Sequence, residues 1–174
     1  NRMMCEAATK RSQELGFEPV VLSTVLEGES REAGIFLGSI AREVEERGTP
    51  IRPPCALIIG GETTCAIAEP SGKGGPSQEL ALGASLKIDG SKRIVLVSMD
   101  TDGTDGPTEI AGGIVDGLTS KRAKERNLDI FRNLMKHNSS RVLTDLEDAI
   151  VTGATGTNVM DLNVIVIGDN RLER

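Results

Sequence analysis

Aromatic residues are nearly absent from this chain of 174 residues, which has no Trp, no Tyr and three Phe. The hydrophobic core must therefore be built from Ile, Leu, Val and Ala, and stacking platforms for nucleic-acid bases are not expected. Basic residues are also fewer than acidic ones, 20 against 26, which gives a formal net charge of −6. Because nucleic-acid surfaces need clustered Lys and Arg, this balance argues against a nucleic-acid partner.

Recognisable cysteine motifs and long apolar runs are missing as well. Cys5, Cys55 and Cys65 follow neither a zinc-finger spacing nor a CxxC pattern, which predicts free thiols in a reducing cytoplasm. No apolar run reaches the roughly 18 residues that cross a bilayer, and no signal peptide is recognisable. We therefore predict a cytoplasmic protein with no membrane partner. Since the chain starts at Asn1 within a helix-like pattern, we expect a piece of a longer protein.

Apolar residues alternate between helical and strand-like spacing along the chain. The strand-like segment 65–68 is expected to lie antiparallel beside 55–60, because only a tight turn separates them. The order of elements predicts an α/β fold with three αβα layers and a mixed sheet. Helices are predicted over 2–15, 30–47, 77–86, 119–126, 130–136 and 140–148, and strands over 19–24, 55–60, 65–68, 93–99, 148–152 and 162–167.

A glycine-rich loop at 72–79 leads into one predicted helix, with Ser77 near its start. Backbone N–H groups and the positive end of a helix dipole can hold an anion there, and Lys73 adds a mobile cation. The loop lacks the GxxxxGK[ST] pattern of a P-loop. It indicates an anion site, and a plain flexible connector is the alternative.

Two further polar loops follow predicted strands. Asp100, Asp102 and Asp105 come after the clearest buried strand, and Mg²⁺ prefers one or two such carboxylates together with phosphate oxygens. An EF-hand is excluded, because glycine is required where Asp105 stands. Local Asx-turns are the alternative interpretation. The loop 152–158 offers hydroxyl and amide donors at a strand end, and a structural turn is its alternative.

Two other polar positions have simpler interpretations. Glu62, with Thr63 and Thr64, follows a buried strand and can position the loop or take part in catalysis. His137 is the only histidine, and nothing near it in sequence supplies a partner, so it is predicted to be a surface or helix-end residue. Serine–histidine and cysteine–histidine mechanisms are therefore not expected.

Four motifs now stand in order: Gly-Gly-Glu-Thr-Thr at 60–64, Gly-Gly-x-x-Gln-Glu at 74–79, Asp-Thr-Asp-Gly-x-Asp-Gly-Pro at 100–107, and Thr-Gly-x-Thr-Gly-Thr-Asn-Val-x-Asp at 152–161. With them, essentially the whole chain resembles the glycerate 2-kinase family, whose C-terminal part is called the MOFRL domain. Some members have been labelled hydroxypyruvate reductase. The resemblance implies phosphorylation of D-glycerate at its 2-hydroxyl, with ATP and Mg²⁺ as cofactors, in a cleft between two α/β domains.

The same resemblance implies a division of the chain and a partner. Residues 1–52 are expected to be the end of the N-terminal α/β domain or a connecting unit, and 53–174 the MOFRL-like C-terminal domain. The protein's own N-terminal domain is then a partner, a homodimer is kept as an option, and the fragment alone is expected to be inactive. The family usually has Arg and Asn where Pro76 and Ser77 stand, and often Asn-Asn-Asp-Ser-Tyr at 137–141.

The rivals are a hydroxypyruvate reductase and a non-catalytic sugar-acid-binding domain. A dinucleotide fingerprint is missing after every predicted strand, which argues against the first. Loss of the family arginine at Pro76 favours the second. The predicted catalytic residues are Lys73, Asp100 and Asp102, with Asp100 and Asp102 holding Mg²⁺ or accepting the hydroxyl proton. The predicted substrate- and phosphate-binding residues are Glu62, Thr63, Gly74, Gly75, Ser77, Gln78, Glu79, Asp105, Thr155, Gly156, Thr157 and Asn158.

Overall fold

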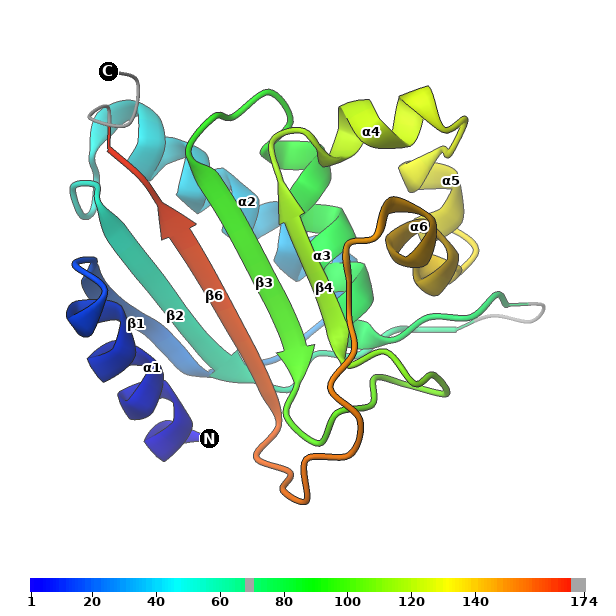
Figure 1. Cartoon of the computed structure of the whole chain (residues 1–174), viewed down its shortest axis with the longest axis horizontal. Helices are drawn as coiled ribbons and strands as arrows, with labels where there is room; N and C mark the ends of the chain where they lie inside the picture. Colours follow the sequence, from blue (N-terminus) through cyan, green and yellow to red (C-terminus); the bar gives the residue numbers. More distant parts are fainter. Residues whose placement is uncertain (68–70, 170–174) are drawn as a thin grey trace.

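One mixed sheet of six strands organises the chain in a computed structural model that describes residues 1–67 and 71–169 (Figure 1). The order across the sheet is β1-β2-β6-β3-β4-β5, in which β1 and β2 are parallel and all other neighbours antiparallel. The predicted α/β fold with a mixed sheet is confirmed. The strands are β1 (Glu18–Leu26), β2 (Cys55–Gly61), β3 (Ile94–Asp100), β4 (Gly112–Asp116), β5 (Ala149–Ile150) and β6 (Asp161–Ile167).

Helices cover the two faces of this sheet unequally (Figure 1). Leu57 and Ile59 of β2 join one large apolar core with the helices of the first face. Gly60, on the other side of the same strand, lies against Asn1 and Cys5. The helix α1 (Arg2–Glu14) packs on that second face, over β1 and β2. The first face carries α2 (Ser30–Arg47), α3 (Pro76–Lys87), α4 (Thr119–Glu125), α5 (Ile130–Leu134) and α6 (Ser139–Leu146).

The burial of the strand residues depends on whether helices cover one or both faces of the sheet. Every residue of β2 is buried, because helices cover both of its faces. In β3 and β4 the core-facing side is buried, whereas Val95 and Ile114 on the opposite side are 38% and 40% exposed. The sandwich therefore has three layers over β2 and two over β3 and β4 within the described residues, whereas β1 lies beside α1 but keeps Val21 and Val25 exposed.

The predicted boundary at residue 52 falls inside a continuous sheet. Strand β1 precedes the boundary and pairs with β2 beyond it, from Glu18↔Cys55 to Leu26↔Gly61. Helix α2 also precedes the boundary and packs against α3. The described residues thus share one sheet and one core, and the assignment of residues 1–52 to another domain of a longer protein stays a prediction.

One strand prediction is wrong, and one strand was not predicted. The predicted strand 65–68 does not form over residues 65–67, and Ala68 lies outside the described residues. After Gly61 the chain crosses to residues 28–30, where Thr64 N donates to Gly28 O at 2.9 Å, and β6 takes the antiparallel place beside β2. Strand β4 was not predicted, since its two glycines weaken the local signal for a strand.

Candidate functional site

Three strand ends meet at one edge of the sheet. Strand β6 runs antiparallel between β2 and β3, so its first residue lies beside their last residues. The register pairs Asp161 with Gly61 of β2 and with Asp100 of β3. This edge is at the bottom of Figure 1, where the loops at 101–111 and 151–160 also lie. The second and third predicted loops therefore lie at a common edge of the sheet.

Glu62, Asp100 and Asp161 form an acidic cluster at this edge. Asp161 is 4% exposed, and its Oδ2 accepts a hydrogen bond from Thr63 N at 3.1 Å. Burial, together with the charges of Asp100 and Glu62, raises the pKa of Asp161 to about 6, against that hydrogen bond. Within residues 1–67 and 71–169, no Lys or Arg forms an ion pair with any of the three. The cluster therefore carries uncompensated negative charge. Asp161 was not among the predicted site residues.

Asp105 caps helix α3. Its Oδ1 accepts from Ser77 N at 3.1 Å and its Oδ2 from Gln78 N at 2.9 Å. The N-cap residue is Gly75 rather than the predicted Ser77, and neither Gly75 nor Pro76 has a capping side chain. Thus the N–H groups that were predicted to bind an anion already bind the chain's own carboxylate. Gln78 Nε2 donates back to Asp105 O at 3.3 Å and fixes the loop.

This cap makes stability depend on pH. Asp105 is 2% exposed, and burial raises its pKa to about 7, against the hydrogen bonds from Gln78 and Ser77. Since the unfolded value is about 3.9, the native state binds this proton more tightly. The contribution is fully present below about pH 4 and is lost as the pH rises through 7. Loss of this stabilisation should lower the free energy of unfolding by up to about 4 kcal/mol between pH 4 and pH values above 7.

Urea unfolding of wild-type protein and of Asp105→Asn at pH 5 and pH 8 measures this effect. The difference between the two pH values should be smaller in the variant. The exposed Asp89 forms only a 3.8 Å ion pair with Lys124, so Asp89→Asn is the matched control and should keep the wild-type dependence. Equal pH dependence in wild type and Asp105→Asn would contradict the assignment.

The second and third loops lie against each other. Asp100 Oδ1 accepts from Asp102 N at 3.0 Å, and Asp102 Oδ1 from Thr104 N at 2.8 Å, which are Asx-type turns. Asp102 Oδ2 accepts from Asn158 Nδ2 at 3.3 Å, and Thr155 N donates to Asp102 O at 3.0 Å. Asp102 therefore organises both loops. Thr155, Gly156, Thr157 and Asn158 are exposed beside it.

The first loop joins the other two through its backbone. Gly75 packs against Asp105, and Gly106 packs against Gly74. Lys73 accepts a hydrogen bond from Ser140 N at its carbonyl oxygen, at 3.1 Å, and is exposed. The predicted residues of all three loops are thus neighbours, with Lys73 on the outer side.

His137 was predicted to have no partner, and this is wrong. Its Nδ1 lies 2.9 Å from Oε1 of Glu79, a predicted binding residue that is 2% exposed. The turn after α5 carries His137 to helix α3, and Gly72 N donates to Lys136 O at 2.7 Å. Cys65 lies at the same place, where burial and then the charge of Glu79 raise its pKa to about 12. Nothing in the sequence spacing indicated these contacts.

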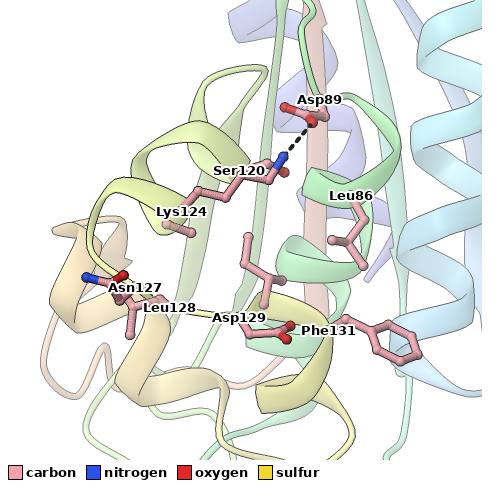
Figure 2. A pocket seen from close by; sticks show the side chains of 10 residues that line it. Leu86, Asp89, Ser120, Lys124, Asn127, Leu128, Asp129 and Phe131 are labelled. Carbon is pink, nitrogen blue, oxygen red and sulfur yellow. Dashed lines mark ion pairs between the residues drawn. The ribbon is translucent and has the colours of Figure 1, made fainter.

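A separate hollow of about 510 Å³ lies at the far end of α3, between that helix and α4 and α5. Figure 2 shows it bordered by Leu86 and Leu128, with the Asp89–Lys124 ion pair on one rim. The twelve residues of α3 place it about 18 Å from the glycine-rich loop. None of the predicted site residues lines it.

The sequence matches the model of the MOFRL family over residues 55–161, which include the acidic cluster and all three loops. The chain belongs to the MOFRL family. Its relatives include a glycerate 2-kinase of Pyrococcus horikoshii, 46% identical over 98% of the chain, and a D-glycerate 2-kinase of Thermotoga maritima, 43% identical over 94%. A putative hydroxypyruvate reductase of Agrobacterium vitis is 35% identical over 95% of the chain.

Solved structures agree with this family assignment. The MOFRL chain superposes on a crystal structure of a Pyrococcus horikoshii protein with a TM-score of 0.95 over 98% of its length, at 46% identity. A crystal structure of glycerate kinase from Thermotoga maritima gives 0.92 over 94%, at 43% identity. The chain spans 39% of each of these two structures and 39–43% of the three relatives. No described helix combines the length and apolarity needed to cross a membrane.

Proposed function

We propose that this chain is the C-terminal part of a kinase that transfers phosphate from ATP to the 2-hydroxyl of D-glycerate. The observation that carries the proposal is the acidic cluster of Glu62, Asp100 and Asp161, placed where the three family loops meet. Phosphoryl transfer asks a protein mainly to position its reactants and to neutralise charge. An acidic cluster that forms no ion pair with a Lys or Arg among the described residues, beside hydroxyl and amide donors, suits that task.

The donor chemistry of the cluster fits Mg²⁺. Carboxylate oxygens are the ligands this ion prefers, and Asp100 and Asp161 face each other in register across β3 and β6. Bound Mg²⁺ would neutralise charge on the phosphate oxygens. We assign Asp100 and Asp161 to this cation, with Glu62 nearby, and give Asp102 the positioning of the loops, since its two oxygens already accept hydrogen bonds.

The remaining predicted residues divide between binding and support. Exposed Thr155, Thr157 and Asn158 offer donors for substrate carboxylate or phosphate oxygens, and Gly156 lets the backbone approach them. Lys73 supplies the mobile positive charge on the other side. Gly74, Gly75, Ser77, Gln78 and Thr63 hold the loops and the α3 cap in place.

A coupled assay on the full-length protein tests the proposal. With ATP, Mg²⁺ and D-glycerate, we expect formation of ADP and 2-phosphoglycerate, and no ADP formation above background without Mg²⁺. Because some relatives are named putative hydroxypyruvate reductase, the same preparation is tested with hydroxypyruvate and NADH or NADPH. Reductase turnover without kinase turnover would overturn the proposal. Binding of D-glycerate without turnover and without nucleotide binding would indicate a non-catalytic binding domain.

A further inference from the structure

Three side chains from separate segments converge beside the glycine-rich loop. Cys65 follows β2, Glu79 lies in the first turns of α3, and His137 follows α5. One potential ligand atom from each lies within 4.8 Å of the other two. The three border a pocket of about 140 Å³ that is also lined by Gly74 and Pro107. This convergence is separate from the acidic cluster, because neither Cys65 nor His137 belongs to it.

We propose that Cys65, Glu79 and His137 form a binding site for Zn²⁺ or another divalent transition-metal ion of similar softness. Thiolate, imidazole and carboxylate are the three side-chain ligands that Zn²⁺ takes in proteins. A thiolate and an imidazole exclude Mg²⁺ as the preferred ion, since Mg²⁺ selects oxygen ligands. The ligand set therefore defines a second cation site that is chemically distinct from the Mg²⁺ site proposed above.

Burial of Glu79 supports a cation at this place. Its side chain is 2% exposed, and in the described part of the chain no Lys or Arg forms an ion pair with it. A buried carboxylate is costly unless a partner compensates its charge. His137, at 2.9 Å and 17% exposed, supplies one hydrogen bond. A divalent ion held between Glu79, His137 and Cys65 would compensate the charge fully.

The separations allow such an ion after small side-chain movements. Zn–S bonds of about 2.3 Å and Zn–N and Zn–O bonds of about 2.0–2.2 Å in a tetrahedron set ligand atoms roughly 3.4–3.6 Å apart. The 2.9 Å between His137 Nδ1 and Glu79 Oε1 must therefore widen slightly, and the other separations, which are at most 4.8 Å, need to close by no more than about 1 Å. Three protein ligands would leave a fourth position for water or a small ligand.

Metal titration of the full-length protein tests the proposal. After removal of bound metal with a chelator, the protein is titrated with Zn²⁺ and with Co²⁺ in the presence of excess Mg²⁺. We expect one equivalent of Zn²⁺ per chain to bind despite the Mg²⁺. Co²⁺ should give a near-ultraviolet thiolate-to-metal absorption band and the strong visible bands of four-coordinate cobalt. The test is independent of kinase activity, because neither the Zn²⁺ stoichiometry nor the Co²⁺ absorption spectrum requires turnover of a substrate.

Two variants locate the site. Cys65→Ser should abolish the thiolate band, and His137→Asn should weaken Zn²⁺ binding by more than the roughly 10–100-fold that loss of an outer hydrogen-bond partner costs. Cys5→Ser is the matched control, because Cys5 is a buried residue of α1 that faces Gly60 of β2, and the substitution should leave the titration unchanged. Circular dichroism checks folding, and each variant tests the site by itself if the other fails to fold. Wild-type binding in both variants, or Co²⁺ binding without a thiolate band, would overturn the proposal.

Discussion

Asp161→Asn in the full-length protein should lower kcat for phosphorylation of D-glycerate by about 10²–10³-fold, the usual cost of removing one group that stabilises transition-state charge. The substitution keeps the shape of the side chain and an oxygen that accepts the Thr63 N–H bond. It removes only the negative charge that we assign to the cation. The variant should also need a higher Mg²⁺ concentration for half-maximal rate.

Stability should move in the opposite direction to activity. Asp161 is buried beside Asp100 and Glu62, and both charges oppose its ionisation. A neutral side chain removes this repulsion, so we expect Asp161→Asn to unfold at a higher urea concentration than wild type at pH 8. Loss of activity with a gain of stability separates a functional charge from a structural one.

Asp89→Asn is again the control, since Asp89 is an exposed residue at the other end of α3. It should leave kcat unchanged. If Asp161→Asn kept the wild-type kcat and Mg²⁺ dependence, the assignment of Asp161 as a ligand of the catalytic cation would be wrong. Asp100 would then be the one remaining residue that we assign to that cation.

The sequence places the three polar loops well, because loops at strand ends follow from the apolar pattern. Buried runs at 55–60, 93–99 and 162–167 lie close to β2, β3 and β6, and the polar motifs come next to them. What the pattern does not contain is strand order. Only the position of β6 between β2 and β3 brings Asp161 beside Asp100, and this depends on packing across the whole sheet.

The wrong predictions and the missed strand also arise from contacts between residues far apart in the sequence. Fifty-eight residues separate Glu79 from His137, so their contact leaves no local signal. Strand β4 begins with two glycines and is held by pairing with β3 and β5 rather than by intrinsic preference. The run at 65–67 has strand-like residues, but the backbone bonds of Thr64 to Gly28 and Ser30 lead the chain away from the sheet edge. In each case a tertiary contact overrides the local pattern.

Helices α2 and α3 pack with their backbones unusually close, and this close packing predicts a large loss of stability. Gly34 of α2 is buried, and a methyl group on it would collide with the carbonyl oxygen of Leu80 in α3. Gly83 of α3 is in the same situation against the carbonyl oxygen of Arg31. Since the obstacles are backbone atoms of a neighbouring helix, they cannot rotate away, and the helices must move apart.

Gly34→Val should therefore lower the free energy of unfolding by about 3 kcal/mol or more, the upper end of the range for overpacked cores. Gly34→Ala should have a smaller effect of the same sign. Helix propensity alone predicts the opposite for Gly34→Ala, a gain of about 1 kcal/mol, so the sign decides between propensity and packing. Urea unfolding measures both variants.

Glu46→Ala on the same helix is the control, because Glu46 is exposed and its ion pair with Arg42 contributes at most about 1 kcal/mol. If Gly34→Ala raised the free energy of unfolding, the interface between α2 and α3 would have space for a methyl group, and the packing argument would be wrong. A graded loss from Ala to Val would show that the two glycines set the distance between the helices. Because α3 begins at the Asp105 cap, that distance also fixes where the glycine-rich loop meets the acidic cluster.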